Sequence, residues 1–200
     1  MLIGSLANIK EIFRQAREHH EPVIFPTDTI YGIGAPISDT TANEKIYEIK
    51  GREKNKPFPV LISNYKQAND LAEITDFQIK IIKKLWPGKF TLILKAKKNI
   101  DSLYVLDGKI ALRMPSEQWL SDLIQYTGAI SATSANRSGI EYEPDETYIL
   151  RHFSQTIKYF VINRTNDTNS STIIDLTGNS PKIIRGEINL HEILSEKEIL

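Results

Sequence analysis

The stretch Pro22–Gly34, PVIFPTDTIYGIG, contains an apolar run that passes directly into a polar turn. Pro22–Phe25 is predicted to be a short buried strand. Hydroxyl and carboxyl side chains follow at once, and two glycines end the segment, so the turn can wrap around a small polar ligand. The same residues also suit an ordinary turn in which Thr27 and Asp28 cap backbone amides, and Asp28 then only holds the loop.

A second informative stretch, KGREKNKPF at Lys50–Phe58, places several cations at the end of a predicted helix. Cations are favoured there by the helix dipole, so a solvated basic helix end is one interpretation. The alternation of Lys50 and Arg52 around Gly51, just ahead of a buried strand, also predicts two cations aimed at one spot. A polyphosphate is the ligand that suits such a pair. Lys54 and Lys56 extend the basic character of the stretch.

The third stretch, SATSANRSG at Ser131–Gly139, is dense in small and hydroxyl-bearing residues. Small side chains let a ligand approach the backbone, while serine and asparagine supply hydrogen-bond donors and acceptors. A central strand that runs into a turn is the alternative interpretation.

Two arginines end predicted strands. Arg113 follows Ile110–Leu112, and Arg185 follows Ile183–Ile184. A cation at the end of a core strand usually has an anionic partner, so each arginine forms either a structural salt bridge or a ligand contact. Ser171 begins another strand, where a capping or edge role is the simpler interpretation.

Capping residues and apolar periodicity predict the remaining elements. Helices are predicted to begin at Asn8 with Glu11, at Thr41 with Glu44 (ending at Gly51), at Asn64 with Gln67, at Thr75 with Gln78 (ending at Trp86-Pro87-Gly88), and over Ser116–Tyr126 before Gly128. Further strands are predicted at Phe58–Ile62, Phe90–Lys95, Lys109–Arg113, Ala129–Thr133, Lys158–Asn163, Ser171–Leu176 and Lys182–Arg185. The irregular interleaving predicts an α/β fold with a twisted mixed β-sheet flanked by helices.

The composition of the chain excludes several classes of protein and of site. The 200 residues, 40% of them apolar, suit one globular domain. The 25 Lys plus Arg balance 25 Asp plus Glu, which argues against a dedicated nucleic-acid binder but leaves a local basic patch open. The absence of cysteine excludes disulfides, thiolate metal sites and cysteine nucleophiles. The N-terminus lacks the apolar region of a signal peptide and no apolar run could span a bilayer, so we expect no membrane association and a cytoplasmic protein.

Several common sites are missing from the sequence. It has no P-loop motif, and Gly32-Ile33-Gly34 is only half of a dinucleotide fingerprint. The four histidines fall in segments that read as polar helix surface, outside the three stretches: His19, His20, His152 and His191. A Ser-His triad or a histidine-rich metal site is therefore disfavoured, and any chemistry must use hydroxyls, amides and cations.

Together, PTDTIYGIG, the helix ending in KGR, LRMP, SATSANRSG, STIID and IIRGE resemble, in that order, the YrdC/TsaC family of L-threonylcarbamoyladenylate synthases. The resemblance covers about Asn8 to Glu187. It implies a single YrdC-like domain over 1–200 with a concave active-site face. The core would cover about 8–187, followed by a short C-terminal helical tail at 188–200, as in the short form of the family without an extra C-terminal domain.

The family implies the reaction of L-threonine, bicarbonate and ATP to L-threonylcarbamoyladenylate, pyrophosphate and water, for N6-threonylcarbamoyladenosine modification of tRNA. Mg²⁺ would enter with ATP, held mainly by the phosphates rather than by a metal site of the protein. By the same resemblance, the catalytic residues are Lys50, Arg52, Ser134 and Asn136. The resemblance implies that ATP is bound by these four residues together with Lys56 and Arg185. It implies that threonine is bound by Thr29, Tyr31, Arg113, Thr133 and Ser171. The implied partners are a downstream threonylcarbamoyl-transferase complex and, weakly, tRNA.

Two positions depart from the usual family pattern. Glu53 stands where proline commonly follows Lys-Gly-Arg, and Lys109 stands where threonine is often found ahead of the Arg113 strand. The first affects the rigidity of the loop, and the second puts one contact of the threonine pocket in doubt.

Three other functions compete with the synthase. They are a non-catalytic RNA-binding protein, a paralogue of the same fold with another substrate, and a carbamoyl-transfer domain like that of hydrogenase maturation proteins. The last belongs to much longer chains with acylphosphatase and zinc-finger modules, which this sequence does not contain. Whether Arg164–Ser170 closes as a lid is not decided by the sequence.

Overall fold

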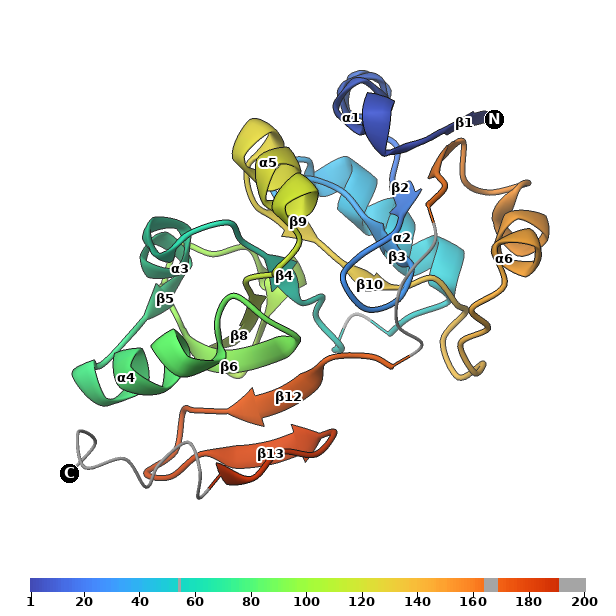
Figure 1. Ribbon diagram of the computed structural model, residues 1–200. Helices are drawn as coiled ribbons and strands as arrows, with labels where there is room; N and C mark the ends of the chain where they lie inside the picture. Colours follow the sequence, from blue (N-terminus) through green and yellow to red (C-terminus); the bar gives the residue numbers. More distant parts are fainter. Residues whose placement is uncertain (54, 164–168, 191–200) are drawn as a thin grey trace.

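The computed structural model describes residues 1–53, 55–163 and 169–190, and within them helices pack against two twisted β-sheets (Figure 1). The predicted α/β class with mixed sheets is confirmed, although the strands divide into two sheets instead of one. Lys54, most of the 164–170 loop and residues 191–200 of the predicted tail lie outside the described residues. In the part of the chain that is described, no helix is both long and apolar enough to cross a membrane.

The first sheet has five strands in the order β1-β11-β2-β3-β10. Their bounds are Leu2–Gly4 (β1), Tyr159–Val161 (β11), Val23–Phe25 (β2), Gly32–Gly34 (β3) and Thr133–Ser134 (β10). Strands β1, β11 and β2 run parallel, whereas β3 is antiparallel to both β2 and β10. The sequence patterns did not predict β1 and β3, which are short and carry glycine.

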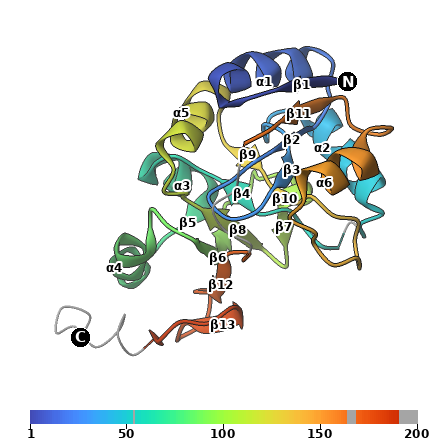
Figure 2. The ribbon, with the colours of Figure 1, turned by 45° about the vertical axis from the view of Figure 1, so that its right-hand side comes forward.

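The second sheet has eight strands, with the main order β13-β12-β6-β8-β4-β9, and with β5 paired to β6 and β7 paired to β8. Their bounds are Lys182–Arg185 (β13), Thr172–Asp175 (β12), Phe90–Ala96 (β6), Lys109–Arg113 (β8), Val60–Leu61 (β4), Ile130–Ser131 (β9), Ala72–Glu73 (β5) and Val105–Leu106 (β7). Strands β12 and β13 lie at the end of the molecule far from β1 and helix α1 (Ile9–Glu18) in both ribbon views (Figures 1 and 2).

One predicted strand, Ala129–Thr133, is two strands in the structure. Residues Ile130 and Ser131 pair with β4 of the eight-stranded sheet, and the chain then joins β3 of the five-stranded sheet at Thr133. The single-strand prediction is wrong because the chain changes sheets between these residues. A run of small side chains allows such a change, but the sequence pattern does not predict it.

The remaining helices are α2 (Thr40–Lys50), α3 (Tyr65–Leu71), α4 (Asp76–Leu85), α5 (Gln118–Thr127) and α6 (Glu146–Phe153), with short 3-10 turns η1 (Leu6–Asn8) and η2 (Ser102–Tyr104). The predicted caps at Asn64 and Thr75 are confirmed, since their side chains accept the backbone N–H groups of Gln67 and Gln78. Helix α6 was not predicted.

Helix α1 begins directly after Asn8, as predicted, but two predicted capping contacts are wrong. The Asn8 side chain accepts the N–H of Ser5 at 2.8 Å and therefore faces back toward η1 instead of capping α1. Glu11, its predicted partner, pairs with Arg14. Helix α2 starts before Thr41, because Asp39 caps it by accepting the N–H of Ala42 at 3.1 Å.

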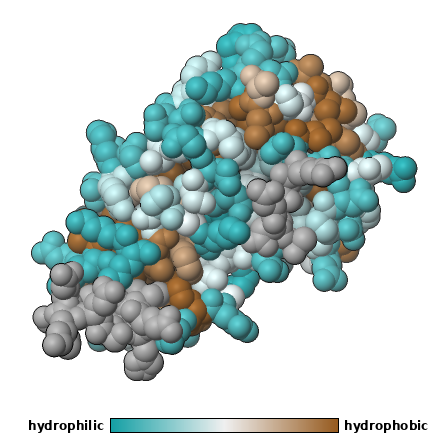
Figure 3. Space-filling model, in the orientation of Figure 1, coloured by the Kyte–Doolittle hydropathy of each residue, from teal (hydrophilic) through white to brown (hydrophobic). Residues whose placement is uncertain are grey.

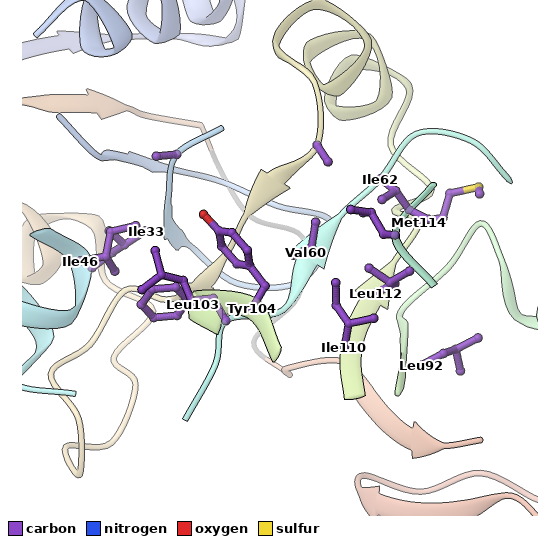
Figure 4. Packing of buried hydrophobic residues seen from close by; sticks show 14 of the residues in the cluster. Ile33, Ile46, Val60, Ile62, Leu92, Leu103, Tyr104, Ile110, Leu112 and Met114 are labelled. Atoms are coloured by element: carbon purple, nitrogen blue, oxygen red, sulfur yellow. The ribbon is translucent and has the colours of Figure 1, made fainter. Parts of the chain in front are cut away.

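The apolar residues form two clusters of buried side chains. In the smaller cluster, α1 and α5 pack on the five-stranded sheet, and the rings of Phe13 and Phe25 meet edge to face at 5.3 Å. In the larger cluster, Leu92, Leu112 and Val60 lie side by side on β6, β8 and β4 (Figure 4). Each fully buried side chain of this kind stabilises the fold by about 1.5–3 kcal/mol.

Because side chains alternate along a strand, the residues between these core positions face the other way. Thr91 and Arg113 lie directly opposite one another on β6 and β8, next to the core pair Leu92 and Leu112. The packing of the core thus presents a polar row on the opposite face of the sheet.

The surface in the orientation of Figure 1 is mostly hydrophilic (Figure 3). An apolar patch lies near the N-terminal strand, where Leu2 and Ile3 of the edge strand β1 are exposed (Figure 3).

Candidate active site

A cavity of ≈ 660 Å³ lies where the two sheets meet. Its walls come from the turn after β2, from β3 and β10 of one sheet, and from β6, β8, β12 and β13 of the other. Among the described residues, five cations and one carboxylate line it: Arg52, Lys56, Lys109, Arg113, Arg185 and Asp107. The size suits a small-molecule ligand, and the excess of cations suits an anionic one.

The three stretches singled out in the sequence converge on this cavity. Most of the predicted site residues line it: Thr29, Tyr31, Arg52, Lys56, Arg113, Thr133, Ser134, Ser171 and Arg185. The other two, Lys50 and Asn136, lie outside the lining.

Arg113, the last residue of β8, is buried and held by the turn after β2. Its Nη2 donates to Asp28 Oδ1 at 2.6 Å, and its Nη1 donates to Thr29 Oγ1 at 3.0 Å. A longer bond of 3.4 Å joins Nε to the carbonyl of Gly88. A guanidinium has five N–H donors, so two remain for a ligand in the cavity.

Ser171, just before β12, and Arg185, at the end of β13, lie on the far side of β6 from Arg113 and line the same cavity. Ser171 Oγ is 2.8 Å from Thr91 Oγ1, and Arg185 Nη2 donates to the carbonyl oxygen of Ser171 at 2.9 Å. Burial lowers the pKa of Arg185, and the nearby Arg113 cation lowers it further. Since Asp28 neutralises one of these two guanidinium groups, the pair keeps a net positive charge that an anion would offset.

Tyr31 contributes to the cavity wall, but its hydroxyl is engaged elsewhere. The hydroxyl donates to Glu146 Oε1 at 2.5 Å and accepts the N–H of Asn163 at 2.9 Å. Burial raises the pKa of Tyr31, and the bond to Glu146 raises it further. The Tyr31 N–H donates to the hydroxyl of Tyr142 at 2.9 Å. Tyr31 therefore ties the turn to α6 and to the end of β11, rather than offering its hydroxyl to a ligand.

Lys50 holds the small-residue turn after β10. Its ammonium group donates to the carbonyl oxygens of Ser134 and Asn136, and at 3.3 Å to Asn136 Oδ1. The residue is 3% exposed, and burial lowers its pKa to about 7, with a smaller contribution from the Arg52 cation. Three acceptors match the three donors of an ammonium group, so Lys50 stabilises the turn that carries Ser134.

Arg52 follows Gly51, whose left-handed conformation (φ 59°) ends α2 and redirects the chain. Its Nε donates to the carbonyl of Lys56 at 2.7 Å, and its guanidinium lies 5.5 Å from the ring centroid of Phe58. Among the described residues Arg52 has no carboxylate partner. Arg52 thus lies in the described lining of the cavity and Lys50 lies outside it, and the hypothesis that both cations act on one ligand stays a prediction.

Sequence reasoning missed three residues of the site. Asp28 had two interpretations, part of a ligand-wrapping turn or a residue that only holds its loop, and neither included its ion pair with Arg113 or the N–H of Ser116 that it accepts at 3.3 Å. Thr91 is a polar residue in the apolar run Phe90–Leu94, a signal that could have placed it opposite Arg113. Tyr142 lies 111 residues from its partner Tyr31, and no local pattern could have found it.

The described histidines take no part in the cavity. His19 and His20 lie at the end of α1, and His152 lies in the last turn of α6. His191 lies outside the described residues. Among the residues that the structure describes, no three His, Asp or Glu side chains gather so that they could hold a metal ion.

The two sheets and the cation-rich cavity between them define an α/β protein whose cavity suits a small anionic ligand. The model of the family Sua5_yciO_yrdC, described as telomere recombination, matches residues 15–186, and the chain belongs to this family. The resemblance found in the sequence motifs is thereby confirmed.

Relatives agree with this assignment. The chain is 34% identical over 177 residues to the threonylcarbamoyl-AMP synthase of Pyrococcus abyssi, an alignment that covers 86% of this chain and 52% of that protein. It is 42% identical over 124 residues to the threonylcarbamoyl-AMP synthase of Bacillus subtilis, covering 60% of this chain and 36% of the relative. The matched part is thus only about a third to a half of these relatives' length.

Solved structures share the fold. The crystal structure of P. abyssi Sua5 complexed with L-threonine superimposes with a TM-score of 0.87 at 30% identity, covering 98% of this chain and 60% of the other. The crystal structure of Escherichia coli YciO superimposes with a TM-score of 0.80 at 21% identity, covering 92% of both chains, and supports the fold alone.

Proposed function

We propose that this protein is an L-threonylcarbamoyladenylate synthase, which converts L-threonine, bicarbonate and ATP to L-threonylcarbamoyladenylate, pyrophosphate and water. The observation that carries the proposal is the cavity of ≈ 660 Å³, whose lining, in the part of the chain that the structure describes, has five cationic residues and one carboxylate. The names of the relatives from P. abyssi and B. subtilis, and the L-threonine complex of P. abyssi Sua5, support it.

Threonine would bind at the Arg113 end of the cavity. The two free N–H donors of Arg113 suit a carboxylate, since a guanidinium binds carboxylates in a planar, bidentate way. Thr29 and Ser171 present hydroxyl oxygens beside it, where they would contact the amine or hydroxyl of threonine. Arg185 supplies the additional charge that balances the substrate carboxylate.

ATP would bind along the wall formed by Arg52, Lys56 and the Ser134 turn. Arg52 has no carboxylate partner among the described residues, so the phosphate chain would provide its counter-charge. Lys50 and Asn136 would act by holding the Ser134 turn, as their contacts in the structure indicate.

The chemistry requires no nucleophile from the protein. The threonine amine combines with bicarbonate to give a carbamate and water, and a carbamate oxygen then attacks the α-phosphorus of ATP. The bond from the α-phosphorus to the bridging oxygen breaks, and pyrophosphate leaves. Two anions must approach one another, so positioned cations and a fixed orientation lower the barrier most.

Mg²⁺ would enter as part of the Mg-ATP substrate. The described residues offer no cluster of carboxylates or histidines for a metal. The phosphates of ATP would therefore provide most of the ligands of the Mg²⁺ ion. Asp107 is the one carboxylate in the described lining of the cavity.

The adenylate is reactive and must be consumed by a transferase, so we propose a downstream threonylcarbamoyl-transferase complex as partner, with tRNA contacted weakly at most. The cytoplasm, where ATP, threonine and tRNA occur together, is the proposed location.

The test is pyrophosphate release by the purified protein with Mg-ATP and bicarbonate, with and without L-threonine. We expect pyrophosphate release by the wild type to depend on threonine, and Arg52→Ala to lose most of this release. Arg113→Lys is expected to raise the KM for threonine, because lysine keeps the charge but loses the bidentate geometry. Lys66→Ala on the exposed face of α3 is the matched control.

Other outcomes point to other functions. ATP binding without threonine-dependent release would favour a paralogue with another substrate. Salt-sensitive RNA binding without any turnover would favour the RNA-binding alternative.

A further inference from the structure

Lys109 is a cation in the cavity lining that the proposed reaction has not yet used. It begins β8, and its Nζ lies 2.9 Å from Asp175 Oδ2 on β12. The pair reaches across β6, which lies between β8 and β12 in the sheet. The Lys109 side chain is 42% exposed, so the ion pair is open to solvent and to the cavity.

The position of Lys109 is set by the strand that also carries Arg113. Lys109, Ala111 and Arg113 are alternate residues of β8, and all three line the cavity. At about 3.3 Å per residue, Lys109 lies roughly 13 Å from Arg113 along the strand. Lys109 and Arg113 therefore lie at opposite ends of the part of the cavity wall that β8 forms.

Two further cations lie toward this end. Strand β4 runs parallel to β8 with Val60 opposite Leu112, so the chain that leads into β4 approaches from the Lys109 end. In that segment Arg52 donates to the carbonyls of Lys56 and Pro57. Arg52, Lys56 and Lys109 all line the cavity, and Asp107, at the β7–β8 turn, is the carboxylate beside them.

The ion pair with Asp175 can be exchanged at little cost. Asp175 Oδ1 also accepts the N–H of Thr177 at 2.8 Å and its hydroxyl at 2.6 Å, so the carboxylate keeps two hydrogen bonds if Lys109 leaves. The Lys109 side chain is 42% exposed and the Asp175 side chain 17%, so water screens the pair on the lysine side and limits its contribution to stability. A polyphosphate carries several charges and would compete effectively for the ammonium group.

We propose that Lys109 binds the polyphosphate of the nucleotide, and that its ammonium group pairs with Asp175 when no nucleotide is bound. The proposal rests on the proposed function, since it assumes that Mg-ATP enters this cavity. Lys109 is then a substrate-binding residue, and Asp175 is its competitor for the same cation.

Calorimetric titration of the whole chain with Mg-ATP, pyrophosphate and adenosine tests the proposal. Lys109→Met is expected to weaken Mg-ATP and pyrophosphate binding about fivefold to tenfold, as for loss of one charge-assisted contact, and to leave adenosine unchanged. Asp175→Asn is expected to tighten both phosphate ligands, because it removes the competitor. The double variant is expected to bind like Lys109→Met.

Lys95→Met is the matched control, because Lys95 lies directly opposite Lys109 on β6 but pairs with Glu73 and does not line the cavity. Lys109→Gln repeats the test if the Met variant does not fold.

The opposite signs of the two single variants separate this role from a structural one. Equal weakening in Lys109→Met and Asp175→Asn would show a cross-strand pair that only supports the sheet, and would overturn the proposal. Unchanged binding in Lys109→Met would overturn it as well, with the proposed function intact. Failure of the wild-type protein to bind Mg-ATP would overturn the proposed function together with it.

Discussion

Lys50 shows how a single residue can have the expected chemistry in an unexpected place. A lysine at a helix end suggests a solvated cation or a phosphate ligand, but here the ammonium group is enclosed by oxygens of the Ser134–Asn136 turn. Burial disfavours its charged form, which is why its pKa falls to about 7.

This lowered pKa predicts a pH-dependent stability. The unfolded chain binds the Lys50 proton up to about pH 10.4, whereas the folded chain releases it near pH 7. Between these values the unfolded state holds more protons, so this residue's contribution to the unfolding free energy rises with pH, by at most about 1.4 kcal/mol per pH unit. Below pH 7 the full cost of burying the charge is present.

The measurement is urea unfolding of the wild type and of Lys50→Met from pH 6 to pH 10. The difference between the two is expected to shift in favour of the wild type as the pH rises. The oxygens left without a donor in the variant lower its stability at every pH and do not affect the slope. Parallel curves would contradict the prediction, and Lys66→Met is the exposed control.

At the scale of elements, the change of sheets between β9 and β10 brings the hydroxyl-rich stretch to the cavity. Ser131 is fully buried at the crossing, where its N–H donates to the carbonyl of Ala35 at 2.9 Å. The next residue, Ala132, donates to the carbonyl of Pro59 at 2.9 Å, and the chain then pairs with β3. Two backbones can cross this closely only where side chains are small.

Gly34 on β3 is the tightest point of this crossing. A Cβ atom there would lie 1.9 Å from the carbonyl oxygen of Ser131, which is backbone and cannot rotate away. We expect Gly34→Ala to lower the unfolding free energy by more than about 2 kcal/mol, as strongly overpacked sites do.

Gly178→Ala is the control, because a Cβ at this exposed position has its nearest contact at 3.7 Å. Its effect should stay within about 0.5 kcal/mol. Equal stability of the two variants in chemical unfolding would show that the sheets separate at the crossing without cost.

At the scale of the whole molecule, the site depends on two sheets held together. Asp28 follows β2 of the five-stranded sheet, and Arg113 ends β8 of the eight-stranded one. Their buried ion pair therefore joins the two halves of the cavity as well as orienting the guanidinium for its ligand.

Asp28→Asn keeps the shape of the side chain but leaves the Arg113 charge unpaired. Breaking a buried ion pair from one side costs about 3–5 kcal/mol, so we expect a loss of that size in urea unfolding. Asp70→Asn removes a carboxylate from the exposed pair with Lys66 and should change stability by less than about 1 kcal/mol. A loss in Asp28→Asn no larger than in the control would show that the buried pair does not join the sheets.

The sequence by itself determined the local features of this protein. Apolar alternation located strands such as Lys109–Arg113, side-chain caps located α3 and α4, and Gly51 marked the end of α2, because each depends on neighbours a few residues away. The order of the motifs also identified the family, which the family match confirmed.

Tertiary structure decided which of these residues meet. Three hydrogen bonds of the site join residues 84 to 115 positions apart: Arg113 to Asp28, Tyr31 to Glu146, and Lys50 to Ser134. No local pattern encodes such pairs, since they follow from strand order and from the change of sheets at Ser131. For the same reason the sequence named Lys50 and Arg52 together, while only the folded chain shows Arg52 in the lining of the cavity and Lys50 outside it, bound to the Ser134 turn.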